Sequence, residues 1–387
     1  MTFHPVSPRF ARRDLLRRLG ASAAGSALAW MASLAAQAAT SRPAAVAAVP
    51  SAAKSNAIIR TVLADVDPGA WSTVTLMHEH LGSGRLEPGG AETEVTNPTQ
   101  DARWMTQEIA AAKKAGIGCI VAAETVLPGP DNLAYLQQLA RSTGMHVIAA
   151  GAYYSSETYP ADTASKTDEQ IARDLVQAAR LRRLGAFGEF GMLNGEAGLS
   201  AVEQKVFRAV AKAQARTGLP IFTHTNYATG AGVSMDAGLR QLDVLEGAGA
   251  RLANVAIGHM CCLDDPMVRV AKAIARRGAF VAFDRLTRQQ QWVPDAKKVA
   301  MVHALLDAGL ADHLLLSSDY IGRINTSVGE VKAYPGPLNA REGGPGYARS
   351  VLVFVPQLRK AGVSEAAIRQ LTVDNPRRFL SFVPVVS

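Results

Sequence analysis

The apolar run Val-Thr-Leu-Met, residues 74–77, is followed by two histidines that are separated by one glutamate. Successive side chains of a β-strand point to opposite faces, so His78 and His80 would share one face while Glu79 points away. Two imidazoles on one face suit a single metal ion, but His-x-His pairs also occur as hydrogen-bonded surface histidines. The motif alone leaves both interpretations open.

Four further residues of metal-ligating types lie at or near the ends of other short apolar runs: Glu189, His224, His259 and Asp319. A lone histidine at a strand end is more often a hydrogen-bonded core residue. Four imidazoles and two carboxylates are too many for a closed structural zinc site, and they suit two divalent ions with positions left for water and substrate. Glu189 is the candidate bridge between the ions, and Asp319 is the candidate catalytic residue that accepts a proton from the attacking water.

The residue types do not select the metal. Imidazole and carboxylate ligands accept zinc, manganese, cobalt or nickel, and availability decides among them. Two Zn²⁺ ions are the expected cofactors, with Mn²⁺, Co²⁺ and Ni²⁺ as alternatives.

These residues can meet only if the runs that carry them are strands ending at one edge. Eight short apolar runs without clean alternation are typical of strands buried on both faces. They are residues 72–80, 118–124, 146–154, 185–191, 220–225, 254–260, 279–284 and 313–319. Between them, capping boxes predict helices that begin at Ser200 and Thr167 and end at Gly218 and Gly185, and Pro266 is expected in the first turn of another helix.

Eight strand–helix units over about 310 residues favour an α/β fold, a single (β/α)8 TIM barrel, because its catalytic groups lie at the C-terminal ends of the strands. The binuclear metal site is expected there. An open doubly wound sheet is the alternative, but no Gly-x-Gly-x-x-Gly loop follows any of the runs.

The N-terminal residues have the pattern of an export signal. Arg12 and Arg13 precede an apolar stretch of small residues that ends near Ala38 in an Ala-x-Ala site. Residues 1–38 are therefore expected to be a twin-arginine-type signal peptide that directs the folded protein to the periplasm. Residues 39–55 are expected to be a flexible linker, and residues 56–387 a single (β/α)8 metal-dependent hydrolase domain. An uncleaved membrane anchor is the alternative, but the stretch is short for a stable membrane span.

The composition, 48% hydrophobic and 19% charged residues in 387, is that of an ordinary globular protein. Removal of residues 1–38, which hold five arginines and one aspartate, lowers the formal net charge from +8 to +4. The remaining basic residues are scattered, so no nucleic-acid partner is expected. The three cysteines, Cys119, Cys261 and Cys262, do not form a disulfide framework, although two of them lie close to His259.

Taken in order, these motifs resemble the phosphotriesterase family of the amidohydrolase superfamily. The resemblance covers residues 76–382 and rests on His-x-His, GAFGEFG, THT, IGH, SSD, the strand-3 loop AGAYYSSETYP and the C-terminal LTVDNPRRFLSF. It implies that His78, His80 and Asp319 hold a more buried ion and that His224 and His259 hold a more exposed one. A hydroxide that bridges the two ions would be the nucleophile.

Glu189 is a departure from part of this family. Phosphotriesterases proper and their lactonase relatives bridge the ions with a carboxylated lysine on the fourth strand, whereas no lysine occurs between Lys166 and Lys205. The glutamate resembles the phosphotriesterase homology branch. We therefore expect an exported metal-dependent hydrolase of a lactone, carboxylic ester or amide. The alternatives are a phosphotriesterase in the strict sense, or a metal-containing binding protein without turnover.

The substrate is expected to be a small molecule, and a homodimer is compatible with this architecture. The candidate substrate contacts are Tyr153, Tyr154, Arg285 and Arg323. The arginines suit a carboxylate or phosphate, or they are surface charges and loop ion pairs. Glu124 and Asp284, at two other strand ends, are candidates for substrate contacts or for supporting the metal ligands.

Overall fold

The computed structural model of the chain describes residues 56–82, 102–125, 127, 130–191, 198–227, 232–287, 293–321 and 336–385. All of them belong to one compact unit, Asn56–Ser387. The expected signal peptide, residues 1–38, the expected linker, residues 39–55, and Arg323 lie outside the described residues. The predictions made for these positions therefore remain predictions.

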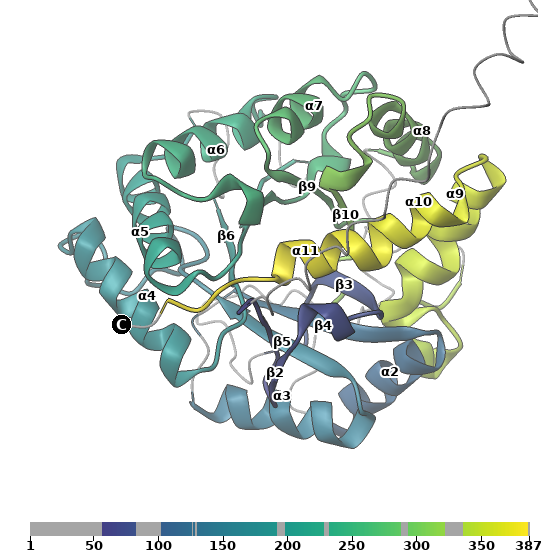
Figure 1. The fold of residues 1–387 in the computed structure, drawn as a ribbon, viewed down its shortest axis with the longest axis horizontal. Helices are drawn as coiled ribbons and strands as arrows, with labels where there is room; N and C mark the ends of the chain where they lie inside the picture. The colour runs from purple at the N-terminus through teal and green to yellow at the C-terminus, as the bar shows by residue number, and fades with distance from the viewer. Residues whose placement is uncertain are drawn as a thin grey trace, which may run out of the picture. The chain divides into compact units, whose positions relative to one another are not determined.

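Eight parallel strands form the centre of the described structure (Figure 1). They are β3 (Val74–Glu79), β4 (Ile117–Glu124), β5 (His146–Gly151), β6 (Phe187–Gly191), β7 (Ile221–His224), β8 (Val255–Ile257), β9 (Phe280–Phe283) and β10 (Leu314–Leu316). The order is β3-β4-β5 in one sheet and β6 to β10, each strand beside the next, in the other. A parallel bridge between Ala150 and Ala186 joins the sheets on one side. On the other side the backbone N–H groups of Asp319 and His80 donate to the carbonyls of His78 and Tyr320, which closes the barrel.

Helices surround the strands (Figure 1). They are α2 (Ala102–Lys114), α3 (Pro130–Thr143), α4 (Asp168–Leu181), α5 (Ala201–Thr217), α6 (Ala237–Gly247), α7 (Arg269–Arg276), α8 (Asp295–Leu306), α9 (Val355–Lys360), α10 (Glu365–Arg369) and α11 (Asn375–Leu380). The alternation of strands and helices confirms the predicted (β/α)8 barrel. A small antiparallel pair, β1 (Ile59–Arg60) and β2 (Asp65–Val66), was not predicted.

The capping boxes predicted two helix starts correctly, whereas the glycine and proline signals were right at one position and wrong at two. The side chains of Thr167 and Ser200 each cap a helix in a full capping box, and Gly218 ends α5 in the left-handed conformation at φ 79°. α4 stops at Leu181, before the expected Gly185. α7 begins at Arg269, so Pro266 precedes that helix and does not lie in its first turn. After α4 the left-handed conformation falls on Arg183, at φ 51°, and before α7 it falls on Val268, at φ 46°, so each helix is bounded nearer to it than the glycine and proline indicated.

The strand side chains divide into an inner cluster within the barrel and an outer layer that packs against the helices. Along β4, Cys119, Val121 and Ala123 belong to the inner cluster. Ile120 and Ala122 belong to the outer layer. The period of two that defines a strand is therefore retained on this strand.

A β-bulge in β3 sets the direction of the first histidine. Leu76 pairs with Ile120 and Glu79 with Ala122, so three steps along β3 match two along β4. Met77 belongs to the inner cluster, and strict alternation would turn His78 outward. The extra residue returns His78 to the inner side, where its ring lies 5.4 Å from that of Phe222. The bulge thus re-aims a side chain next to the candidate site.

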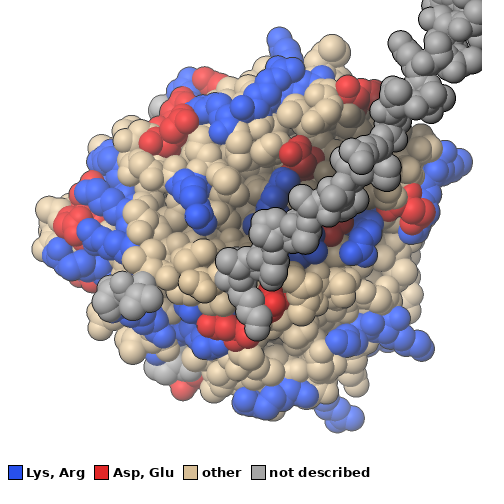
Figure 2. Space-filling model, viewed as in Figure 1, with Lys and Arg blue, Asp and Glu red and all other residues tan. Residues whose placement is uncertain are grey.

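None of the helices in the described ranges is long and apolar enough to cross a membrane. On the face shown in Figure 2, the described Lys and Arg residues alternate with Asp and Glu and with wide uncharged areas.

Candidate metal centre

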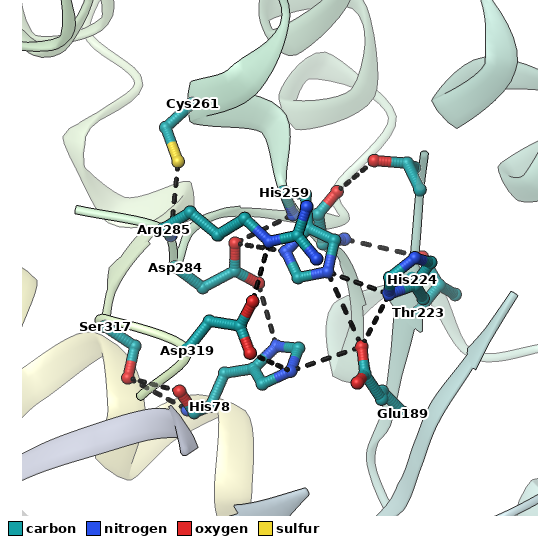
Figure 3. Close-up of polar contacts among 12 residues, drawn as sticks. His78, Glu189, Thr223, His224, His259, Cys261, Asp284, Arg285, Ser317 and Asp319 are labelled. Carbon is teal, nitrogen blue, oxygen red and sulfur yellow. Dashed lines mark hydrogen bonds and ion pairs between the residues drawn. The ribbon is translucent and has the colours of Figure 1, made fainter. Parts of the chain in front are cut away.

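The Glu189 carboxylate lies among four imidazoles from three different strand ends. Figure 3 shows three of them, those of His78, His224 and His259. Its Oε2 is 2.8 Å from Nδ1 of His224, 3.2 Å from Nε2 of His78 and 3.5 Å from Nε2 of His259. Its Oε1 is 3.4 Å from Nε2 of His80. The predicted bridge therefore occupies a central position among the predicted ligands.

Asp319 completes the cluster from the residues that follow β10. Its Oδ1 is 2.8 Å from Nε2 of His80 and 3.8 Å from Nε2 of His78. Its backbone has φ 50°, in the left-handed region. A non-glycine residue in that region is unusual and is often found at a functional site.

Glu79 fixes the segment that carries Asp319. Its buried carboxylate accepts hydrogen bonds from the backbone N–H of Ser318 at 2.8 Å, the backbone N–H of Tyr320 at 2.7 Å and the hydroxyl of Ser317 at 2.7 Å. The sequence predicted only that Glu79 points away from the two histidines. The structure shows that it ties β3 to the residues on both sides of Asp319.

Asp284 supports two of the ligands from behind. Its Oδ2 is 2.9 Å from Nδ1 of His78, and its Oδ1 is 3.0 Å from Nδ1 of His259. Oδ1 also accepts the backbone N–H of His259 at 2.8 Å. A carboxylate that accepts Nδ1–H orients the ring and leaves the Nε2 lone pair for a metal ion. This is one of the supporting roles that the sequence left open for Asp284.

His224 is oriented in the opposite sense, by a residue that the sequence reasoning missed. Its Nε2 lies 3.0 Å from Oδ1 of Asn226, and its Nδ1 faces Glu189. The side-chain amide of Gln241 donates to the His224 carbonyl at 2.6 Å. A polar residue two positions after a strand-end histidine was the only available signal for Asn226.

The electrostatics of the cluster favour cations between the carboxylates. Burial would lower the pKa of His78, but Glu189 and Asp284 raise it well above its ordinary value. Burial opposes the ionised form of Glu189, yet His78 and His224 hold the pKa of Glu189 well below its ordinary value. Burial and the charge of His259 lower the pKa of His224 to about 4. Ionised carboxylates thus draw positive charge into this site, and a divalent ion can supply it in place of protons.

Three groups of side chains in the described structure could each hold a metal ion. They are His78 with His80 and Asp319, Glu189 with His224 and His259, and His78 with His259 and Asp284. The first two groups match the ligand sets that the resemblance implies. We assign the third to hydrogen bonding, because Asp284 contacts the Nδ1 atoms of both imidazoles.

The exposure of the histidine side chains in the two matching groups runs against the order that the resemblance implies for their ions. The His80 side chain is 16% exposed, whereas His224 is 4% and His259 is 0% exposed. The group that contains His224 and His259 was expected to be the more exposed one. Tyr154 and Asn226 contact the His224 ring, and the rings of His224 and His259 lie 4.5 Å apart and cover one another.

The predicted tyrosine contacts separate in the structure. The hydroxyl of Tyr154 lies 3.4 Å from Nδ1 of His224, and the two rings are 5.1 Å apart. Tyr153 packs in the outer layer, where its ring lies 6.1 Å from that of Tyr159. We therefore keep Tyr154 as a candidate substrate contact and no longer assign one to Tyr153.

Arg285 is not a surface charge, but it does form an ion pair, which is one of the roles that the sequence left open. It is 7% exposed, and its Nε lies 2.6 Å from Oδ2 of Asp319. Its backbone N–H donates to Sγ of Cys261 at 3.3 Å. None of the three candidate metal groups in the described residues includes a cysteine, and Cys119, Cys261 and Cys262 are free thiols.

Glu124, at the end of β4, is a buried carboxyl whose Oε1 makes no hydrogen bond to a described residue. Burial raises its pKa to about 7, against an opposing effect of His80. Glu124 is therefore coupled electrostatically to the metal centre without a hydrogen bond that fixes a ligand.

The family model of the Phosphotriesterase family matches residues 57–380. The chain belongs to the phosphotriesterase family. Within it, the chain is 30% identical over 311 residues to the phosphotriesterase homology protein of Escherichia coli, an alignment that covers 79% of this chain and 97% of that protein. A crystal structure of the same bacterial protein, complexed with phosphate in its active site, superimposes with a TM-score of 0.67. That comparison covers 80% of this chain and 99% of the other at 28% identity.

Two further relatives have more specific names. The N-acetyltaurine hydrolase of Xenopus tropicalis is 26% identical over 299 residues, which is 73% of this chain and 79% of that enzyme. The aryldialkylphosphatase of Saccharolobus solfataricus is 25% identical over 313 residues, which is 79% of this chain and 94% of that enzyme. This protein is thus a phosphotriesterase-family hydrolase built on a (β/α)8 barrel.

Proposed function

We propose that this hydrolase cleaves a lactone, carboxylic ester or amide with the help of two divalent metal ions. The observation that carries the proposal is the position of Glu189, whose carboxylate oxygens lie between 2.8 and 3.5 Å from ring nitrogens of four histidines. Of these, an amide is favoured by the relative named as an N-acetyltaurine hydrolase.

The donor atoms fit divalent ions. Nδ1 of His78 contacts Asp284, so its buried Nε2 is directed at the carboxylates of Glu189 and Asp319, 3.2 and 3.8 Å away, without a well-formed hydrogen bond to either. A divalent ion between these oxygens and the nitrogen would satisfy the imidazole lone pair and both carboxylates together. We assign His78, His80 and Asp319 to one ion, with Glu189 bridging to the other.

The second ion would be held by His224 and His259 together with Glu189. Two ions bound at these residues would lower the pKa of a shared water and polarise the oxygen of the bond to be cleaved. Zinc is the proposed metal, and manganese, cobalt and nickel suit the same ligands.

The protein's own residues have separable tasks. Asp319 presents Oδ1 to the ligand side and Oδ2 to Arg285, so its carboxylate has a fixed orientation and can accept a proton during turnover. Glu79 holds the backbone on both sides of Asp319. The hydroxyl of Tyr154, beside His224, can donate a hydrogen bond to a bound substrate.

Phosphotriester hydrolysis is the second candidate function. It is supported by the similarity to the aryldialkylphosphatase and by the phosphate in the active site of the E. coli relative. Strict phosphotriesterases have a carboxylated lysine at the position of Glu189. The glutamate therefore argues for the first candidate. A metal-containing binding protein without turnover is a third alternative, to be decided by the same experiment.

We also propose export to the periplasm, on the basis of the twin-arginine pattern in residues 1–38. Cell fractionation of the wild type and of an Arg12→Lys, Arg13→Lys variant tests it. Wild-type protein in the periplasm and variant retained in the cytoplasm would support export; equal distribution would contradict it.

The function is tested by metal content and turnover together. Protein purified without added metal is compared with Glu189→Gln and with Glu108→Gln. Glu108 is the control because it is a buried glutamate that accepts the backbone N–H groups of Ala340 and Arg341 and belongs to none of the three candidate metal groups in the described residues. The substrates are lactones, carboxylic esters, N-acyl amides and paraoxon. We expect about two ions per chain in the wild type and the control and fewer in Glu189→Gln. One ion or none after incubation with zinc or manganese would refute the binuclear site. Two ions without turnover would favour a binding protein, and turnover of paraoxon alone would favour the phosphotriesterase.

A further inference from the structure

The guanidinium of Arg285 is the strongest unexplained feature of the barrel mouth. Its backbone is held on both sides, because the N–H donates to Sγ of Cys261 and the carbonyl accepts from the buried Nζ of Lys298 at 2.7 Å. Nε donates to Asp319 at 2.6 Å. The position of this cation is therefore fixed before any substrate arrives.

Part of the guanidinium has no partner. The side chain is only 8% exposed, and its buried Nη1 makes no hydrogen bond to any residue in the described ranges. A donor of a charged group that is buried without an acceptor destabilises the protein. An arrangement that holds such a donor rigidly is explained if an acceptor on a ligand satisfies it.

The guanidinium points toward the catalytic side of the cluster. In Figure 3 the Arg285 side chain reaches across His259 toward His224. Its Nε is bound to Asp319, whose other oxygen faces His80 and His78. A ligand group that reaches Nη1 is therefore close to the position where the reacting bond would lie.

We infer that Arg285 forms an oxyanion subsite, and that the substrate is an ester or amide that carries a carboxylate, sulfonate or phosphate near the cleaved bond. A planar guanidinium whose Nε is already paired still offers Nη donors to a second planar or tetrahedral oxyanion. The inference rests on the proposed hydrolase function and names its substrate class.

The test compares two chromogenic esters that differ mainly in charge: 4-nitrophenyl hemisuccinate, which is anionic, and 4-nitrophenyl butyrate, which is neutral. Both are measured with the metal-loaded wild type, Arg285→Gln and Arg285→Lys. Arg277→Gln is the control, because Arg277 pairs with Asp243 and Glu246 on the outer surface. Binding of inorganic phosphate is measured in parallel by calorimetry, and metal content is measured for each protein.

We expect the wild type to prefer the anionic ester by about tenfold in kcat/KM, which corresponds to one good charged contact. Arg285→Gln should lower kcat/KM for the anionic ester about tenfold more than for the neutral one, mainly through KM, and should weaken phosphate binding by a similar factor. Arg285→Lys should restore part of the phosphate affinity.

Equal losses on both esters, with phosphate affinity unchanged in both variants, would overturn the inference and leave Arg285 as a residue that only positions Asp319. The proposed function fails in a different way. If no ester or amide is cleaved by the loaded wild type, hydrolysis is refuted. Phosphate binding that depends on Arg285 would still establish the subsite, and binding that does not depend on it would refute both.

Discussion

Replacement of Asp284 by Asn should weaken both proposed metal sites at once. Asp284 contacts Nδ1 of His78 at 2.9 Å and Nδ1 of His259 at 3.0 Å, and these imidazoles belong to different ligand sets. An asparagine keeps the shape but replaces one oxygen by an NH₂ group, which cannot accept an imidazole N–H. It also removes the negative charge that raises the pKa of both rings against the effect of burial.

The size of the effect follows from the number of contacts. Loss of a hydrogen bond that orients a metal-bound histidine typically costs about 10- to 100-fold in metal affinity. Because Asp284 supports one histidine in each set, the product of the two dissociation constants should rise by about 10² to 10⁴. Direct ligands are untouched, so the variant should still reach two ions at sufficient metal concentration.

The assay is a competition titration of Zn²⁺ against a chelator of known affinity, for the wild type, Asp284→Asn and Asp265→Asn. Asp265 is a suitable control because it is also a buried aspartate that accepts a backbone N–H, that of Val270, outside the cluster. The reasoning is refuted if Asp284→Asn weakens only one of the two ions or neither, or if Asp265→Asn has the same effect.

Three further outcomes are expected. Asn226→Ala should lower the affinity of only the ion assigned to His224, by about tenfold, because it removes the acceptor at Nε2. Asn226→Asp keeps that acceptor and should retain the affinity. Co²⁺ absorption spectra at increasing metal concentration distinguish the two sites, and loss of both ions in Asn226→Ala would contradict the assignment. In the metal-free folded protein the pKa of Glu124 is raised to about 7, so the folded protein binds this proton more tightly than the unfolded chain does. The contribution of Glu124 to stability therefore falls as the pH rises from about 4.5 to 7. Glu124→Gln should therefore raise the free energy of unfolding by on the order of 3 kcal/mol at pH 8 and by little at pH 5, measured with urea, and an equal gain at both pH values would disprove the assigned cause. Tyr154→Phe should raise KM or lower kcat severalfold, whereas Tyr153→Phe should leave both kinetic constants near wild type; the reverse order would contradict the placement of the two rings.

Much of the fold was predictable because its signals are local. Apolar runs of strand length, capping boxes at Thr167 and Ser200, and the glycine after α5 each act over a few residues. The polar residues at the strand ends also follow from topology, since parallel strands in a barrel deliver their carboxyl ends to one face. Helix ends were less predictable because the last turn responds to neighbouring elements.

The sequence by itself determined the (β/α)8 barrel, the family, and the six side chains that meet at the barrel mouth. The tertiary structure alone decided how those side chains are aimed and supported. The β3 bulge depends on register with β4, the dual contact of Asp284 joins residues 25 and 206 positions apart, and the pairing of Arg285 with Asp319 spans 34 positions. Such contacts depend on where distant backbones come to lie, and residue type and spacing along one strand do not encode that position. Local chemistry therefore names the candidate ligands, and long-range packing orients them.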